Sequence, residues 1–184
     1  MADNPLGIYV GAALGEAHVR SEELRSGETT PFTFDQSQFG WKVFLGARPL
    51  SVVGVELVYS DFGSVNAPTP GAFAYFNANS KQNAASAFGI GYLPLPVPYL
   101  DLYGKLGVAH LHTQSQVATQ PFSCPAGSTC TIYGVSQSQS STDLAYGAGA
   151  QAKFGALAVR IEYERINASG GNPDLFSLGL SWAF

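Results

Sequence analysis

The last eight residues of the chain, SLGLSWAF (177–184), place an apolar side chain at every second position. Leu178, Leu180, Trp182 and Phe184 alternate with serine, glycine and alanine. A period of two is typical of a β-strand with one apolar face. That face continues to the final residue of the sequence, so the fold has to supply an apolar surrounding for it.

The same alternation recurs in seven further stretches, and helical periodicity is hard to find anywhere in the chain. The links between the stretches are short around 49–51, at 94–98 and at Gly155, whereas the others are long or polar. Strands joined by short turns must be antiparallel. The pattern therefore predicts an all-β fold, an eight-stranded antiparallel up-and-down barrel in one domain over residues 1–184. The strands are expected at about 6–18, 38–49, 52–62, 83–93, 99–112, 142–154, 156–166 and 174–184, with the long or polar links at 19–37, 63–82, 113–141 and 167–173.

The composition indicates that the apolar face points outward to lipid. Hydrophobic residues make up 46% of the chain and charged residues only 12%, about half the usual charged share of a soluble domain. No run of about 18 apolar residues is present, so a membrane-spanning helix is not expected. The net charge of −4 argues against a nucleic-acid partner. A soluble barrel with its apolar face turned inward remains the alternative.

The opposite face is rich in glycine and carries balanced charge, which suits the crowded lumen of a small barrel. Gly46, Gly89, Gly91 and Gly147 are examples. Opposite charges inside a narrow lumen pair with one another, because a single buried charge would be costly. The predicted lumen network consists of Lys42, Arg48, Glu56, Asp101, Lys105, Lys153, Arg160, Glu162 and Glu164.

Aromatic residues near the strand ends are expected on the lipid face, in the two interfacial girdles of a membrane barrel. In the stretch 83–93 the bulky side chains Phe88, Ile90 and Tyr92 are assigned to the lipid face by the same rule, against Ala87 and the two glycines. The girdle residues predicted in this way are Trp41, Tyr59, Tyr92, Tyr146, Tyr163, Trp182 and Phe184.

The stretches IYVGAALG (8–15), GWKVFLGARP (40–49), VGVELVYSDFG (53–63) and AVRIEYERI (158–166) resemble the small outer-membrane barrels of Gram-negative bacteria of the OmpA/OmpX type. The resemblance implies an integral outer-membrane location, a signal peptide removed on export, and long loops that face outside the cell. It also implies insertion by the outer-membrane assembly machinery, which would recognise the terminal signal. The residues of that signal here are Leu178, Leu180, Trp182 and Phe184. Larger family members add a periplasmic domain after the barrel, and the terminal Phe favours a complete chain.

Two features are candidates for local chemistry. Cys124 and Cys130 flank a short Pro/Gly-containing loop and are expected to form a disulfide, the alternatives being free thiols or half of a metal site. His110 and His112 lie near Ser115 and Ser138 in the expected topology, on the lipid-facing wall where some outer-membrane barrels hydrolyse lipid A. Because no acidic partner is evident, we expect no catalytic, metal or cofactor site.

The favoured function is a non-enzymatic outer-membrane barrel with a structural or surface-interaction role, such as adhesion or host contact through its long loops. A narrow channel for small solutes and a lipid A-modifying enzyme are the alternatives. The partners expected are outer-membrane lipid and lipopolysaccharide, the assembly machinery during biogenesis, and host-cell or other extracellular ligands. The protein is expected to be a monomer.

Overall fold

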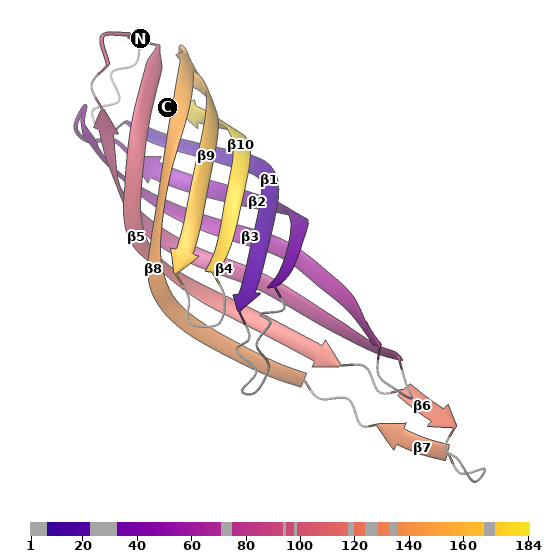
Figure 1. The fold of residues 1–184 in the computed structure, drawn as a ribbon. Coiled ribbons are helices and arrows are strands. Elements are labelled where there is room, and N and C mark those ends of the chain that lie inside the picture. The colour runs from indigo at the N-terminus through magenta and orange to yellow at the C-terminus, as the bar shows by residue number, and fades with distance from the viewer. Residues whose placement is uncertain are drawn as a thin grey trace.

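A computed structural model describes residues 7–22, 33–70, 75–93, 95–97, 99–117, 120–123, 129–132, 136–167 and 172–184. Eight antiparallel strands close into a barrel, with the neighbour order β1-β10-β9-β8-β5-β4-β3-β2 (Figure 1). The predicted eight-stranded antiparallel barrel is therefore confirmed. The wall strands are β1 (Ile8–Glu22), β2 (Thr33–Ala47), β3 (Val53–Pro70), β4 (Tyr75–Leu93), β5 (Leu100–Val117), β8 (Ser136–Phe154), β9 (Leu157–Asn167) and β10 (Asn172–Ala183).

The ring closes between the first and the last strand of the wall. Val10 pairs with Trp182 and Leu14 pairs with Leu178 in the β1–β10 ladder. This pairing leaves no open edge among the wall strands, as a lipid surrounding requires. The start of β1 and the end of β10 lie at one end of the barrel (Figure 1), together with the short links near 48–52 and 155–156. We call this the short-turn end and the opposite one the long-strand end.

The wall strands bury one face and expose the other in alternation. In β9, Ile161 and Tyr163 are exposed on the outer wall, whereas Arg160 and Glu162 are buried. The same outward placement of apolar side chains holds for the end of the chain, where Leu178, Leu180, Trp182 and Phe184 are all exposed. The terminal strand thus presents its apolar face to the lipid side, as its alternation predicts. Among the described residues there is no helix long and apolar enough to cross a membrane.

Strand β4 has its faces the other way round from the sequence prediction. Phe88, Ile90 and Tyr92 are buried in the barrel interior, whereas Gly89 and Gly91 are exposed on the outer wall. Tyr92 is therefore not a girdle residue. The other six predicted girdle residues are exposed. The prediction failed because the stretch 83–93 contains no charged residue that would mark the lumen face.

Glycine makes room in the lumen where β1 and β2 meet. A Cβ atom added at Gly46 would collide with the ring of Tyr9, which is buried in the interior. The absence of a side chain at Gly46 therefore allows a large aromatic ring to pack against β2. Gly91 offers a contrast, because a Cβ atom added there meets no atom within 4 Å.

At the long-strand end, six strands run well past the predicted ends of the alternating stretches, namely β1, β2, β3, β4, β5 and β8. β3 and β5 have 18 residues each, and β4 and β8 have 19 each, against 11 for β9 and 12 for β10. Figure 1 shows these four strands continuing beyond the rest of the barrel at the long-strand end. Much of the predicted loops 63–82 and 113–141 is thus strand. A separate two-stranded hairpin, β6 (Gln120–Ser123) and β7 (Thr129–Ile132), lies in the second of them.

Strand β3 has an irregularity where it leaves the regular part of the wall. The pairing with β4 shifts between Asp61 and Ser64, and Gly63 adopts a φ of 83°, which favours glycine. The Gly63 backbone N–H donates to Oδ1 of Asp61 at 2.8 Å. A bulge of this kind bends a strand, so β3 changes direction shortly after Tyr59.

Candidate functional site

The barrel interior holds a network of six ionised side chains from four strands. Lys42, Lys105 and Arg160 carry three positive charges and Glu56, Glu162 and Glu164 carry three negative charges, so their formal sum is zero. All six are buried. In the strand order of the ring, β3 with Glu56 stands opposite β9 with Arg160, and these two side chains form an ion pair. The network therefore crosses the lumen from one side of the wall to the other.

Each cation of the network contacts more than one carboxylate. Nζ of Lys42 lies 2.9 Å from Oε2 of Glu162 and 2.8 Å from Oε2 of Glu164. Lys105 forms ion pairs with Glu162 and Glu164, and its Nζ lies 3.6 Å from Oε1 of Glu56. Burial removes the hydration of each ion, and a buried ion pair offsets that cost only when its geometry is good and further partners are present. The shared carboxylates supply those further partners.

Arg160 connects the network to two tyrosines. Its Nη1 donates to Oε2 of Glu56 at 2.7 Å, and its Nε donates to the hydroxyl oxygen of Tyr103 at 3.0 Å. The hydroxyl of Tyr9 donates to the same Glu56 oxygen at 2.9 Å. The guanidinium carbon lies 4.4 Å from the centroid of the Phe44 ring. Hydrogen bonds and a ring face thus surround this buried cation on several sides.

The ring of Phe88 packs against the network, a contact that the sequence did not indicate. Its ring centroid lies 4.4 Å from Nζ of Lys105. Ile90 and Tyr92 form a second buried cluster with Tyr103. The inward-facing bulk of β4 therefore fills the lumen beside the ion pairs. The register contained the missing signal, because Tyr92 pairs with Tyr103 and antiparallel partners share a face.

A second charged group closes the short-turn end of the lumen. Oδ2 of Asp101 lies 2.6 Å from Nη1 of Arg48 and 3.1 Å from Nζ of Lys153. The side-chain amide of Gln151 donates to the same oxygen at 2.9 Å. The Arg48 guanidinium also lies over the Tyr92 ring, 3.8 Å from its centroid. The structure therefore divides the nine predicted lumen charges into one group of six and one group of three.

The two histidines face outward and form hydrogen bonds across the β5–β8 ladder. Nδ1 of His110 lies 2.9 Å from Oγ1 of Thr142, and Nδ1 of His112 lies 2.9 Å from Oγ of Ser140. Ser140 thus takes the place beside His112 for which the sequence suggested Ser115 or Ser138. Nε2 of His112 lies 3.1 Å from the Gln114 amide nitrogen. Within the described part of the chain, neither histidine has a hydrogen bond to a carboxylate.

The predicted disulfide is not tested by the structure. Cys124 lies outside the described residues, and Cys130 lies in β7, where its backbone pairs with that of Phe122. The Cys124–Cys130 bond therefore stays a prediction.

The closed barrel and its filled lumen agree with a family match that spans the whole chain. Residues 1–184 match the profile of the outer membrane protein β-barrel domain. The chain belongs to this family. It is therefore an integral outer-membrane barrel of the kind found in Gram-negative bacteria, and its predicted location is confirmed. A search of curated proteins gave no match.

Solved structures of other outer-membrane barrels share the fold of this one. Ail of Yersinia pestis, in complex with the heparin analogue sucrose octasulfate, matches with a TM-score of 0.62 at 19% identity, covering 97% of this chain and 100% of its own. OprG of Pseudomonas aeruginosa matches with a TM-score of 0.59 at 15% identity, covering 97% of this chain and 96% of its own. The N-terminal β-barrel domain of OprF from the same organism matches with a TM-score of 0.58 at 16% identity, covering 97% of this chain and 98% of its own.

Proposed function

We propose that this outer-membrane barrel is a non-enzymatic surface protein that presents an almost uncharged, strand-built projection outside the cell. The observation that carries the proposal is the length of β3, β4, β5 and β8. The girdle residue Tyr59 lies much closer to the start of β3, at Val53, than to its end at Pro70. At about 3.3 Å per residue, the part of β3 that follows Tyr59 adds roughly 35 Å of strand beyond the girdle.

The direction of the projection follows from the position of the short links between the strands. The start of β1 and the end of β10 lie at the short-turn end, together with the short links near 48–52 and 155–156 (Figure 1). In outer-membrane barrels the short turns face the periplasm and the longer connections face outside. We therefore assign the long-strand end, with its projection, to the cell exterior.

The composition of the projection indicates what it contacts. Segment 113–141 contains no Asp, Glu, Lys, Arg or His, and segment 63–82 contains a single charged residue, Lys81. Ser, Thr, Gln and Asn supply hydrogen-bond donors and acceptors instead. The fitting ligand is an uncharged one rich in hydroxyl or amide groups. A polyanion such as the heparin analogue seen with Ail finds no cationic cluster in these segments.

The lumen network argues against the channel alternative. A permeating solute would have to separate Lys42 and Lys105 from the carboxylates that both of them contact. The hydrolase alternative has a serine–histidine pair, His112 and Ser140. In the described part of the chain, that pair lacks a hydrogen bond to the orienting acid that would activate it. We therefore assign no catalytic step to the protein.

Whole-cell adherence tests the surface role. A bacterial host that does not adhere would express the parent protein, a variant with 64–80 and 115–137 replaced by short turns, and a control with only the 23–32 segment shortened. We expect the parent and the control to promote adherence to cultured cells and the shortened variant to lose it. Heat-modifiable mobility on gels would verify that each barrel is folded. Equal adherence of the shortened variant and the parent would refute the proposal.

A neutral and a sulfated oligosaccharide, immobilised on separate surfaces, would test the ligand chemistry. Purified parent protein is expected to bind the neutral surface and to leave the sulfated surface at background. Binding to the sulfated surface alone would contradict the argument from composition.

A further inference from the structure

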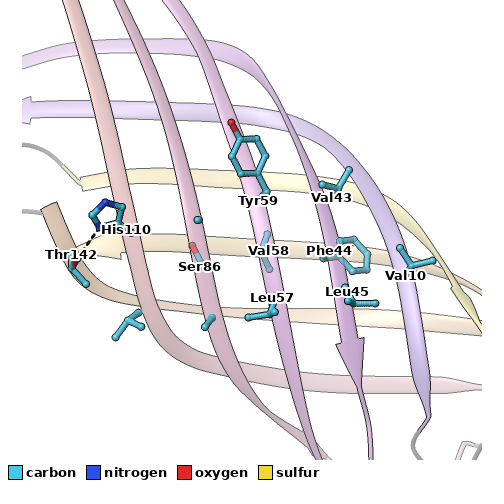
Figure 2. A pocket seen from close by; sticks show the side chains of 13 residues that line it. Val10, Val43, Phe44, Leu45, Leu57, Val58, Tyr59, Ser86, His110 and Thr142 are labelled. Atoms are coloured by element: carbon cyan, nitrogen blue, oxygen red, sulfur yellow. Dashed lines mark hydrogen bonds between the residues drawn. The ribbon is translucent and has the colours of Figure 1, made fainter. Parts of the chain in front are cut away.

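The outer wall is hollowed where β4 passes between its neighbours. The hollow has a volume of about 540 Å³. Ala85 and Ala87 of β4 line it, together with Leu57 and Tyr59 of β3 and Val108 of β5. Beyond β3 the hollow continues over β2 and β1, where its lining includes Val43, Leu45 and Val10. Figure 2 shows Tyr59 and Leu57 on one strand, with the His110–Thr142 hydrogen bond at the edge of the view. The lining is thus almost wholly apolar, with a polar border.

The hollow interrupts the aromatic girdle of the wall. The rings of Trp41 on β2 and Tyr59 on β3 lie 6.0 Å apart, centroid to centroid. The next strand offers only Ala85 as the partner of Tyr59. Exposed tyrosines resume on β8 and β9, with Tyr146 and Tyr163. The aromatic band is therefore broken at β4 and β5, and the gap is continuous with the lipid-facing wall.

Polar side chains border the hollow on the side of the long-strand end. Successive rows of the β4–β5–β8 ladders pair Ala85 with His110 and Thr142, then Asn83 with His112 and Ser140, then Lys81 with Gln114 and Ser138. Antiparallel partners share a face, so these rows stand on the outer wall with His110 and Gln114, which are exposed. We call His110, His112, Gln114, Lys81, Ser140 and Thr142 the polar rim.

We propose that the hollow and the polar rim together bind one molecule of lipopolysaccharide, with an acyl chain in the hollow and the phosphorylated sugar headgroup on the rim. The inference rests on the orientation assigned under the proposed function, because the rim then stands at the outer leaflet with the hollow beneath it. A lipid of that leaflet has the same order, with its headgroup outward and its chains inward. The hollow alone would accept the chain of any lipid.

The selectivity has to come from the rim. An acyl chain gains no hydrophobic free energy when it moves from lipid into an apolar hollow, so fit and hydrogen bonds determine the preference. His112 uses both ring nitrogens within the rim, whereas Nε2 of His110 makes no hydrogen bond to the described chain. Lys81 adds the positive charge that a phosphate prefers. Asp61 of β3 is the ladder partner of Asn83 beside the rim and accepts a hydrogen bond from Gly63, so the phosphate has to bind on the Lys81 and His110 side of the rim.

Native mass spectrometry of the full chain, released from detergent micelles after incubation with purified lipopolysaccharide, tests the site. One variant fills the hollow with Ala85→Leu and Ala87→Leu. Its matched control places the same two changes outside the hollow, as Ala148→Leu and Ala150→Leu, which lie on the same face of β8. A third variant, His110→Ala with Lys81→Ala, weakens the rim. Phosphatidylglycerol serves as the competing anionic lipid.

We expect the parent and the β8 control to retain one lipopolysaccharide. The hollow variant and the rim variant are expected to lose about tenfold in apparent affinity, which corresponds to about 1.4 kcal/mol. Equal retention by the hollow variant and the parent would overturn the site, as would equal retention of phosphatidylglycerol. A dimer of the parent that the hollow variant abolishes would assign the hollow to a second copy and also overturn it. None of these readouts depends on adherence, so the surface role can fail separately.

Discussion

Removal of Arg160 is the sharpest test of the lumen network, because this side chain joins two carboxylates and a tyrosine. Arg160 is 2% exposed, its Nη1 lies 2.7 Å from Glu56, and its Nη2 lies 3.7 Å from Glu162. Arg160→Met keeps much of the volume and removes the charge. The network would then carry three negative and two positive charges. Breaking a buried pair by removing one partner costs about 3–5 kcal/mol, and we expect a loss of unfolding free energy in that range.

A second substitution separates lost charge from lost packing. Glu56→Gln in the Arg160→Met background restores neutrality, and its amide oxygen still accepts the hydrogen bond from the hydroxyl of Tyr9. We expect the double variant to recover about 2 kcal/mol of the loss, within the usual coupling between residues in contact. The recovery is partial because Lys105, 3.6 Å from Glu56, loses a neighbouring carboxylate.

The measurement is reversible urea unfolding of the barrel in lipid vesicles, followed by the fluorescence of Trp41 and Trp182. Arg165→Met is the matched control, because Arg165 lies on the outer face of the same strand and is only partly buried. Charges on a protein surface contribute about 0–1 kcal/mol, and because Arg165 is only partly buried the control should lose far less than Arg160→Met. A loss below about 1 kcal/mol for Arg160→Met, or a double variant less stable than the single one, would refute the reasoning.

Four further outcomes follow from the fold. In planar bilayers the parent should conduct little or no current, and a stable open-pore conductance would contradict the filled lumen. Without reductant, thiol reagents should label neither Cys124 nor Cys130, and Cys130→Ser should cost roughly 2 kcal/mol of stability; labelled thiols in the parent would exclude the disulfide. Gly46→Leu should destabilise by about 1–3 kcal/mol because it displaces the Tyr9 ring, whereas unfolding should be unchanged for Gly91→Leu. Deletion of Phe184 should lower the amount of barrel recovered in outer-membrane fractions at equal synthesis, and undiminished recovery would argue against a terminal assembly signal.

Charge determined how well the faces of the strands could be predicted from sequence. In β9, Arg160 and Glu162 mark the lumen face, so Ile161 could be assigned to lipid without knowledge of the partners. In β4 no charged residue marks the lumen face over 83–93. The large side chains were assigned to the lipid face because of their size, and this assignment was wrong. Register would have corrected the assignment, because Tyr103 shares the lumen face of β5 with the charged residues and pairs with Tyr92 across the short link at 94–98.

The contacts within the lumen were beyond the reach of sequence reasoning. Alternation places Lys42 and Glu162 on the same interior, yet their heights depend on the tilt and stagger of strands 120 residues apart in sequence. The lengths of β3 and β8 were missed for a different reason. In a membrane barrel the apolar residues of the outer face are needed only where the wall meets lipid, and a strand that continues into water beyond the lipid needs no such alternation.

The misassigned strand and the outer hollow have the same physical origin. β4 directs Phe88, Ile90 and Tyr92 inward, where they pack beside Lys105 and Tyr103. Successive side chains of a strand point to opposite faces, so the outward positions of this segment are the ones that hold Ala85, Ala87, Gly89 and Gly91. Side-chain volume is therefore added to the lumen and missing from the outer wall over the same segment. Because β4 directs its large side chains inward, it helps to fill the lumen. The same arrangement leaves a space on the lipid side that the side chains of the neighbouring strands do not fill.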